Sequence, residues 1–206
     1  MNVTIASLAL VLASPVMIIF AALIKLTSPG PIFYSQARVG LDRRRGREDQ
    51  NNYDRRAQDL GGLPFMIYKF RTMHVGAEDP HSAVWATQGD PRVTPLGRFM
   101  RKFRIDEVPQ LINVILGDMN IVGPRPERPS IFSRLRVDID DYSLRQRAKP
   151  GITGWAQVNH SYDTSLDDVR TKVRYDLEYL ERQSVREDLR IMARTVPVMI
   201  FRKGGW

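Results

Sequence analysis

The feature that most constrains this chain is an uncharged apolar segment at its start. No Asp, Glu, Lys or Arg occurs from Asn2 to Ile24, and apolar side chains dominate the segment. As a straight helix it would be about 35 Å long, which is enough to cross the hydrocarbon core of a bilayer. Because its apolar character is not confined to one stripe, a membrane-inserted helix is favoured over the core helix of a soluble domain.

Ser14 and Pro15 interrupt this segment near its middle. Proline removes a backbone donor and clashes with the preceding turn, and a neighbouring serine can bond the carbonyl that is freed. A helix broken in this way either crosses the membrane or bends and returns to the face from which it entered. We expect re-entry, so residues 1–26 form a membrane-inserted re-entrant helix and residues 27–206 a domain at one membrane face.

The net charge narrows the class of partner. Lys and Arg total 31 against 23 Asp and Glu, which gives a formal charge of +8. Such a surplus favours nucleic acid, acidic lipid or a phosphorylated substrate as the partner.

The chain has no Cys, which excludes a disulfide framework, a thiolate metal site and a Cys nucleophile. Residues 41–63 mix Arg with acidic residues and contain little that could pack, which predicts a mobile insertion.

Residue patterns in the remainder predict an α+β fold that is mainly helical, with a small β element. Alternation over 65–73 predicts a strand that places Lys69 and Arg71 on one face. An apolar stripe between basic residues over 94–103 predicts an amphipathic helix on the membrane surface, although a core-facing helix has a similar pattern.

Three further helices are predicted towards the C-terminus. An apolar run over 111–116 indicates the first, and Ser165 and Ser184 are suitable caps for the second and third.

Two adjacent carboxylates, Asp106 and Glu107, lie between the basic stripe and the first of these helices. We expect Asp106 to cap that helix, with Pro109 in its first turn. The positive end of the helix dipole and the nearby cations should keep Asp106 ionised, which suits a nucleophile or a metal ligand. A cap and a first-turn acid without chemical function are the alternative.

Two stretches rich in Pro and Gly follow. Three prolines within 123–129 fix the backbone around Arg125 and Arg128, so their guanidinium groups are presented at low entropic cost, as bidentate binding of a diphosphate requires. A merely rigid connection is the alternative. Residues 150–159 combine turn residues with a short strand, and Trp155 in this stretch could stack on a base, lie at the lipid interface or fill the core.

The motifs resemble those of the bacterial sugar transferase family, in the same order. They are KFRTM over 69–73, RIDEVPQL over 104–111, GPRPE over 123–127 and PGITGWAQVN over 150–159. The resemblance covers essentially the whole chain, including the broken apolar helix and the Tyr175-Asp176 pair. Two departures are a 41–63 segment longer than is usual and no preceding transmembrane helices, which indicates a minimal member or a shortened chain.

The resemblance implies a monotopic phosphoglycosyl transferase, also called a polyprenyl-phosphate hexose-1-phosphate transferase. Such an enzyme moves a sugar-1-phosphate from a nucleotide diphosphate sugar, usually a UDP-sugar, onto undecaprenyl phosphate and releases UMP. It acts at the cytoplasmic face of the bacterial inner membrane, where it starts the assembly of a polysaccharide or glycoconjugate. Membrane lipids are then partners as well, and a homo-oligomer is left open.

The same resemblance implies roles for individual residues. Asp106 would attack the phosphorus that carries the sugar and form an aspartyl-phosphosugar intermediate, and Glu107 would assist the second step. Both carboxylates would bind Mg²⁺. The residues expected to bind substrate phosphates are Lys69, Arg71, Arg101, Arg125 and Arg128. Those expected in a nucleotide or sugar pocket are Trp155, Gln157, Asn159 and Asp176.

Two other functions compete with this one. A basic, membrane-associated protein could bind nucleic acid, but the apolar segment over 2–24 argues against that partner. A membrane scaffold without chemistry would have no use for Asp106 and Glu107 close to rigid arginines. We therefore expect an enzyme with no nucleic-acid partner.

Overall fold

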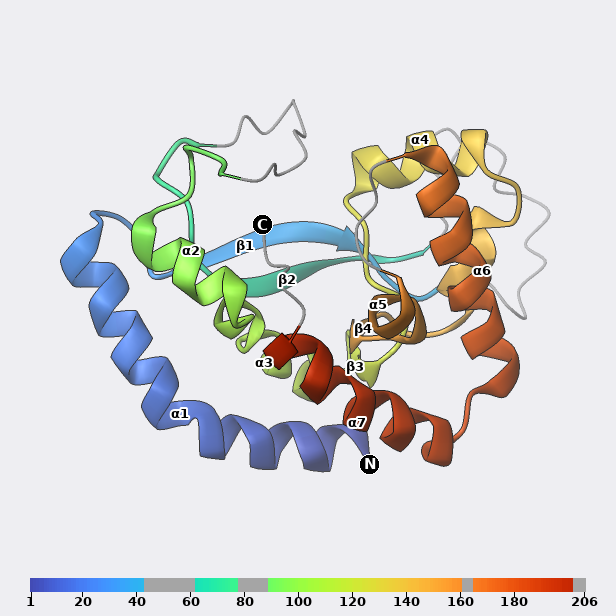
Figure 1. Ribbon diagram of the computed structural model, residues 1–206, viewed down its shortest axis with the longest axis horizontal. Helices are drawn as coiled ribbons and strands as arrows, with labels where there is room; N and C mark the ends of the chain where they lie inside the picture. The colour runs from blue at the N-terminus through green and yellow to red at the C-terminus, as the bar shows by residue number, and fades with distance from the viewer. Residues whose placement is uncertain (43–61, 78–88, 161–164, 202–206) are drawn as a thin grey trace. The chain divides into compact units, whose positions relative to one another are not determined.

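The computed structural model describes residues 1–42, 62–77, 89–160 and 165–201, so most of the predicted 41–63 insertion lies outside the described residues. The chain divides into two compact units. Unit 1 comprises Met1–Gln36, Ile67–Gly117 and Ala193–Trp206, and unit 2 comprises Ala37–Met66 and Asp118–Met192. Helices predominate and the few strands are short (Figure 1), which confirms the predicted fold class.

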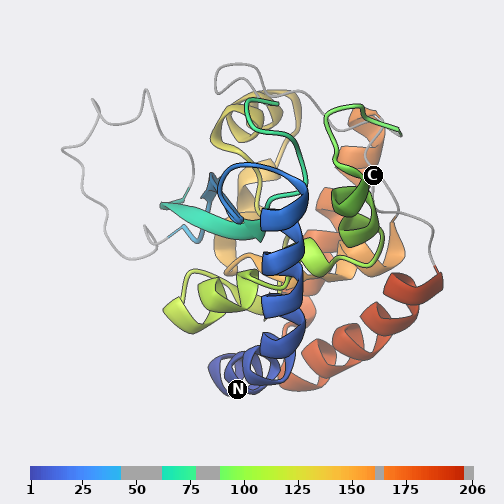
Figure 2. The same cartoon turned by 90° about the vertical axis from the view of Figure 1, so that its left-hand side faces the viewer.

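The first helix of unit 1, α1 (Asn2–Thr27), is long and apolar enough to cross a membrane. The Ser14 hydroxyl donates to the Val11 carbonyl at 2.7 Å. That carbonyl is the one that an N–H at position 15 would bond in a regular helix, and Pro15 has none. Figures 1 and 2 show α1 bending near its middle. The helix thus bends but continues through Pro15 without interruption, and both the predicted break and re-entry into the membrane stay predictions.

Three short helical elements follow in unit 1: α2 (Pro95–Lys102), the 3₁₀ helix η2 (Ile105–Glu107) and α3 (Gln110–Leu116). Apolar side chains of α2 and η2 pack with the second half of α1. The buried centre of this core is Ile24, Phe70 and Met100, with Met17, Phe20, Ala21, Ile32, Leu96 and Ile105 around it.

The helix predicted over 94–103 is confirmed as α2. It starts where the Thr94 hydroxyl accepts a hydrogen bond from the Gly97 N–H at 2.9 Å. Gly97 lies so close to the Thr72 carbonyl that an added Cβ would collide with it. Glycine at this position therefore allows α2 to approach the backbone of Thr72.

Two strands connect the units. β1 (Phe33–Val39) and β2 (Pro64–Phe70) form a two-stranded sheet, and each strand begins in one unit and ends in the other. The predicted strand over 65–73 is thus confirmed as far as Phe70. Arg71 lies beyond the strand end, so it does not share a strand face with Lys69 as the alternation predicted.

Unit 2 has a second small sheet, in which β3 (Asn120–Val122) and β4 (Gly151–Thr153) are parallel. The helical elements of this unit are α4 (Pro129–Asp138), the 3₁₀ helix η3 (Tyr142–Arg147), α5 (Trp155–Asn159) and α6 (Leu166–Arg182), and α7 (Val185–Phe201) continues into unit 1. The predicted short strand within 150–159 is therefore followed by a short helix.

A compact apolar core holds unit 2 together. It consists of Val39, Ile131, Phe132, Leu135, Ile139, Tyr142, Val169 and Val173, with Leu177 packed against it. Ser165 and Asp168 form a reciprocal capping box at the start of α6, and Ser184 accepts a hydrogen bond from the Glu187 N–H at the start of α7. Both predicted caps are therefore confirmed.

Candidate active site

The two residues of the predicted catalytic pair are consecutive and buried in η2 of unit 1. Asp106 is 8% exposed and Glu107 6% exposed. The prediction that Asp106 caps the following helix is wrong, because α3 begins at Gln110 and Pro109 occupies its cap position. The chain before Pro109 instead closes a tight turn, in which the Glu107 N–H donates to the Arg104 carbonyl at 3.1 Å.

Arg104 sets up this turn. Its backbone is left-handed, with φ 54° and ψ 24°, a conformation that costs a non-glycine residue on the order of 1 kcal/mol. Its guanidinium Nη1 lies 3.2 Å from Glu107 Oε2, while Lys69 Nζ lies 2.9 Å from Glu107 Oε1. Two cations thus hold the two oxygens of one buried carboxylate. Arg104 was missed as a site residue, although its spacing of three from Glu107 is a usable signal.

Two other cations predicted to bind phosphate have different surroundings. The Arg101 Nε donates to the Thr72 hydroxyl at 2.8 Å, which orients its partly exposed guanidinium. The Arg71 guanidinium is buried and donates to the carbonyls of Ser28, at 2.7 Å, and Pro29, at 2.6 Å. Arg71 therefore anchors the chain that leaves α1, and its predicted phosphate contact stays a prediction.

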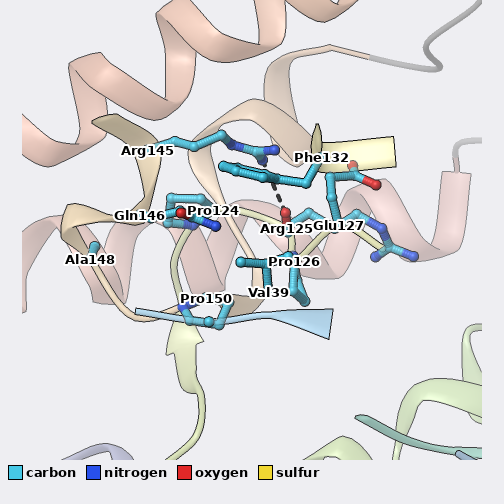
Figure 3. A pocket seen from close by; sticks show the side chains of 11 residues that line it. Val39, Pro124, Arg125, Pro126, Glu127, Phe132, Arg145, Gln146, Ala148 and Pro150 are labelled. Atoms are coloured by element: carbon cyan, nitrogen blue, oxygen red, sulfur yellow. Dashed lines mark hydrogen bonds between the residues drawn. The ribbon is translucent and has the colours of Figure 1, made fainter. Parts of the chain in front are cut away.

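In unit 2, β3 leads into the proline-rich loop 123–128, and α4 begins directly after Arg128. Arg125 and Arg128 are both partly exposed. A small pocket lies beside this loop (Figure 3); it is lined by Val39, Gly40, Pro124, Arg125, Pro126, Glu127, Phe132, Arg145, Gln146, Ala148 and Pro150. The loop that carries the two predicted phosphate-binding arginines is therefore also one wall of a pocket.

Glu127 lies among cations. Its Oε1 is 3.2 Å from Lys172 Nζ, and its Oε2 is 3.9 Å from Arg38 Nη1. Burial by itself would raise the pKa of this carboxyl, but Lys172, Arg145 and Arg38 outweigh burial and lower the pKa to about 2. Glu127 is therefore ionised at any pH at which such a protein works.

Asp176, predicted for a nucleotide or sugar pocket, is 2% exposed. Its Oδ2 is 2.7 Å from Nη2 of Arg145 and accepts a hydrogen bond from Nε at 2.9 Å. Burial by itself would lower the pKa of Arg145, but Asp176, Tyr142 and Glu127 raise it, so the guanidinium stays charged. Asp176 thus binds a protein cation, and its predicted role in a nucleotide or sugar pocket stays a prediction. No sequence motif indicated Arg145.

The three remaining pocket candidates lie on α5. The Trp155 indole N–H donates to Glu178 at 3.0 Å, and the Arg190 guanidinium lies over the indole ring, 5.6 Å from its centroid. The side-chain amides of Gln157 and Asn159 donate to the carbonyls of Ile152 and Trp155. These contacts are local, and the predicted ligand roles of Trp155, Gln157 and Asn159 stay predictions.

A metal ion would need substrate oxygens as additional ligands. Within the described part of the chain, no group of three or more His, Cys, Asp or Glu side chains is arranged to hold one. Mg²⁺ is commonly bound by one or two carboxylates together with substrate phosphates and water. The adjacent carboxylates of Asp106 and Glu107 fit that kind of site.

Two buried carboxylates in η2 of unit 1, one of them bound by Lys69 and Arg104, are elements found in group-transfer enzymes that act on anionic substrates. The sequence matches the family model for bacterial sugar transferases over residues 1–202. The chain therefore belongs to the bacterial sugar transferase family, as the resemblance of its motifs indicated.

Three relatives illustrate the match. The chain is 40% identical to the UDP-N-acetylgalactosamine-undecaprenyl-phosphate N-acetylgalactosaminephosphotransferase of Aeromonas hydrophila, over 97% of this chain and 43% of that protein. It is 40% identical to the UDP-glucose:undecaprenyl-phosphate glucose-1-phosphate transferase of Escherichia coli (strain K12), and the match covers 95% of this chain and 38% of that protein. A protein of that same name from Caulobacter vibrioides is 38% identical, and the match covers 97% of this chain and 68% of that protein. The chain thus spans about two fifths of the first two relatives.

Proposed function

We propose that this chain transfers a sugar-1-phosphate from a nucleotide diphosphate sugar to undecaprenyl phosphate, and that the donor is a UDP-sugar. The observation that carries the proposal is the buried Asp106–Glu107 pair in a chain of this family, in which Lys69 and Arg104 bind the Glu107 carboxylate. The similar proteins named above are undecaprenyl-phosphate transferases of sugar phosphates, and their names give UDP-sugars as donors. By this proposal the product starts a polysaccharide or glycoconjugate.

In the first step, a carboxylate oxygen of Asp106 attacks the phosphorus that bears the sugar. A bond forms between this oxygen and the phosphorus, and the bond to the bridging oxygen of the diphosphate breaks. UMP leaves with the electron pair, and an aspartyl-phosphosugar remains. Lys69, Arg101 and Arg104 supply positive charge in the same unit, which favours the approach of the anionic donor to a carboxylate.

In the second step, a phosphate oxygen of undecaprenyl phosphate attacks the same phosphorus, and the Asp106 carboxylate leaves. Glu107 accepts the proton if the lipid phosphate arrives protonated. We also propose that Arg125 and Arg128 bind donor phosphates through their guanidinium groups. Mg²⁺ held by the two carboxylates and the diphosphate would offset negative charge.

The reaction would take place at the cytoplasmic face of the inner membrane. Support comes from the exposed apolar surface of α1, where Val11 is 68% and Leu12 71% exposed. A lipid environment would cover these side chains. Lipids are then direct partners of unit 1.

The experiment that tests the mechanism separates the two steps. Purified protein in detergent is incubated with UDP-glucose or UDP-N-acetylgalactosamine and labelled UMP, without lipid acceptor. Wild type should exchange label into the UDP-sugar and carry a sugar-phosphate adduct on the peptide that contains Asp106, and Asp106→Asn should do neither. Glu107→Gln should retain more of the exchange than of the overall transfer to lipid.

A different result would replace this mechanism. If exchange required undecaprenyl phosphate and no adduct formed during turnover, transfer would occur directly in a ternary complex. Asp106 would then act as a metal ligand only.

A further inference from the structure

The backbone of the loop 124–128 is bonded at every residue. Its five carbonyls accept hydrogen bonds from the Gly151 N–H (3.0 Å), Arg145 Nη2 (3.0 Å), Arg38 Nη1 (3.1 Å), the Val39 N–H (2.9 Å) and the Phe132 N–H (2.8 Å), in chain order. Pro124 and Pro126 have no N–H to satisfy and fix their own φ angles. The loop therefore has one defined backbone conformation.

Two of these five donors are side chains, and the better buried one is Arg145. Each nitrogen of its guanidinium has a partner: Nε and Nη2 contact Asp176, Nη1 donates to the Tyr142 hydroxyl at 2.9 Å, and Nη2 also donates to the Arg125 carbonyl. Figure 3 marks this hydrogen bond from Arg145 to the Arg125 carbonyl with a dashed line. The Arg145 side chain is 3% exposed and that of Asp176 2%, so both side chains are buried inside unit 2.

The second side-chain donor approaches the next carbonyl of the loop. Arg38 Nη1 donates to the Pro126 carbonyl and lies 3.9 Å from Glu127 Oε2. Successive carbonyls, those of Arg125 and Pro126, thus each bind a guanidinium. Such charged donors make stronger hydrogen bonds than neutral ones.

We propose that Arg145, itself held by Asp176, is a positioning residue that sets the backbone from which Arg125 presents its guanidinium to the donor diphosphate. This inference rests on the proposed function. Arg145 does not contact the substrate in this proposal, and it acts through its hydrogen bond to the Arg125 carbonyl. A preformed Arg125 binds the diphosphate with less loss of conformational entropy than one on a mobile loop.

A purely structural role for Arg145 would have different consequences. Lysine at position 145 keeps the charge beside Asp176, but it has one nitrogen in place of the planar fork, so it cannot make all the contacts of the arginine at once. If Arg145 only stabilises the fold, Arg145→Lys should change stability and leave donor affinity unchanged in folded protein. If Arg145 positions Arg125, donor affinity should fall.

The test compares Arg145→Lys with Arg147→Lys, the same substitution at an exposed position of η3. Binding of UDP-glucose and UDP-N-acetylgalactosamine to the full chain is measured by titration, together with KM and kcat. Arg145→Lys should raise Kd and KM about tenfold, the usual effect of losing a hydrogen bond to a charged group, with kcat little changed. Hydrogen exchange of the peptide over 124–132 should become faster. Arg147→Lys should match wild type in all four measurements.

A double-mutant cycle with Arg125→Ala tests whether the two residues act together. In the Arg125→Ala background, Arg145→Lys should produce no further loss of donor affinity. If the effects of the two substitutions on donor affinity multiplied in the double variant, the proposal would be overturned, because Arg145 would then act independently of Arg125. Tyr142→Phe, which removes one Arg145 contact and keeps the ring, gives the same test if Arg145→Lys does not fold; we expect a loss of about threefold that again vanishes with Arg125→Ala.

The outcome also separates this inference from the proposed function. If wild type neither binds UDP-sugars nor releases UMP from them, the proposed function itself fails. If wild type does both and the Arg145→Lys and Tyr142→Phe variants bind donors as tightly, the function stands and the positioning role is refuted.

Discussion

Replacing Glu127 by glutamine should destabilise the protein, by an amount that depends on pH. The cations around this carboxylate lower its pKa from 4.5 to about 2. One pKa unit corresponds to about 1.4 kcal/mol, so the ionised form contributes about 3 kcal/mol to folding at neutral pH. Its side chain is only 15% exposed, so solvent screening reduces this value little.

The sign of the pH dependence follows from the direction of the pKa change. A lowered pKa means that the stabilisation is fully present above the unfolded-state pKa, near 4.5, and is lost as the pH falls towards 2. Glutamine keeps the shape of the neutral acid but cannot ionise. The difference in unfolding free energy between wild type and Glu127→Gln should therefore be about 3 kcal/mol at pH 7 and about 2 kcal/mol at pH 3.5.

Urea unfolding in detergent, followed by circular dichroism at both pH values, measures this difference. Asp167→Asn is the matched control, because the Asp167 side chain is 86% exposed and its removal should change stability by less than about 0.5 kcal/mol. The reasoning would be refuted if Glu127→Gln were as stable as wild type at pH 7, or if the difference were the same at pH 3.5.

Two further predictions concern unit 1. If α1 re-enters the membrane at its bend, cysteines introduced at Val3 and Asp167 should be labelled by an impermeant maleimide from the same, cytoplasmic side of inverted vesicles, and labelling of position 3 only from the other side would show a spanning helix. Arg104→Gly should lower kcat about tenfold or more, because Glu107 loses a cation. The free energy of unfolding in urea should change by less than about 1 kcal/mol, since glycine adopts the left-handed φ of 54° freely. Arg104→Lys, measured beside it, should retain more activity. Equal kcat in wild type and Arg104→Gly would show that the contact between Arg104 and Glu107 does not contribute to the reaction.

The features that the sequence predicted correctly are those with local causes. Near the bend in α1, Pro15 lacks an N–H, and the Ser14 hydroxyl one residue away donates to the Val11 carbonyl as expected. The capping box at Ser165 likewise involves atoms only three residues apart. Such hydrogen bonds form within one turn of chain, so residue types and spacing determine them.

The catalytic pair shows where local reasoning fails. The sequence identified Asp106 and Glu107 as the candidate catalytic residues, yet it placed Asp106 as the cap of α3. The structure has a separate 3₁₀ turn, entered through the left-handed Arg104 and followed by Pro109. Lys69, which holds Glu107, is 38 residues away in the chain. A contact of that kind depends on how β2 packs in unit 1.

The charge network of unit 2 was decided by tertiary structure alone. Arg145 binds Asp176 across 31 residues and the Arg125 carbonyl across 20, and Arg38 reaches Pro126 across 88. The sequence indicated a rigid loop from its prolines, but it gave Asp176 a pocket role and no role to Arg145. Whether a charged residue binds substrate or another protein group depends on which groups are buried beside it, because burial makes an unpaired charge costly. That partner is known only when the chain has folded.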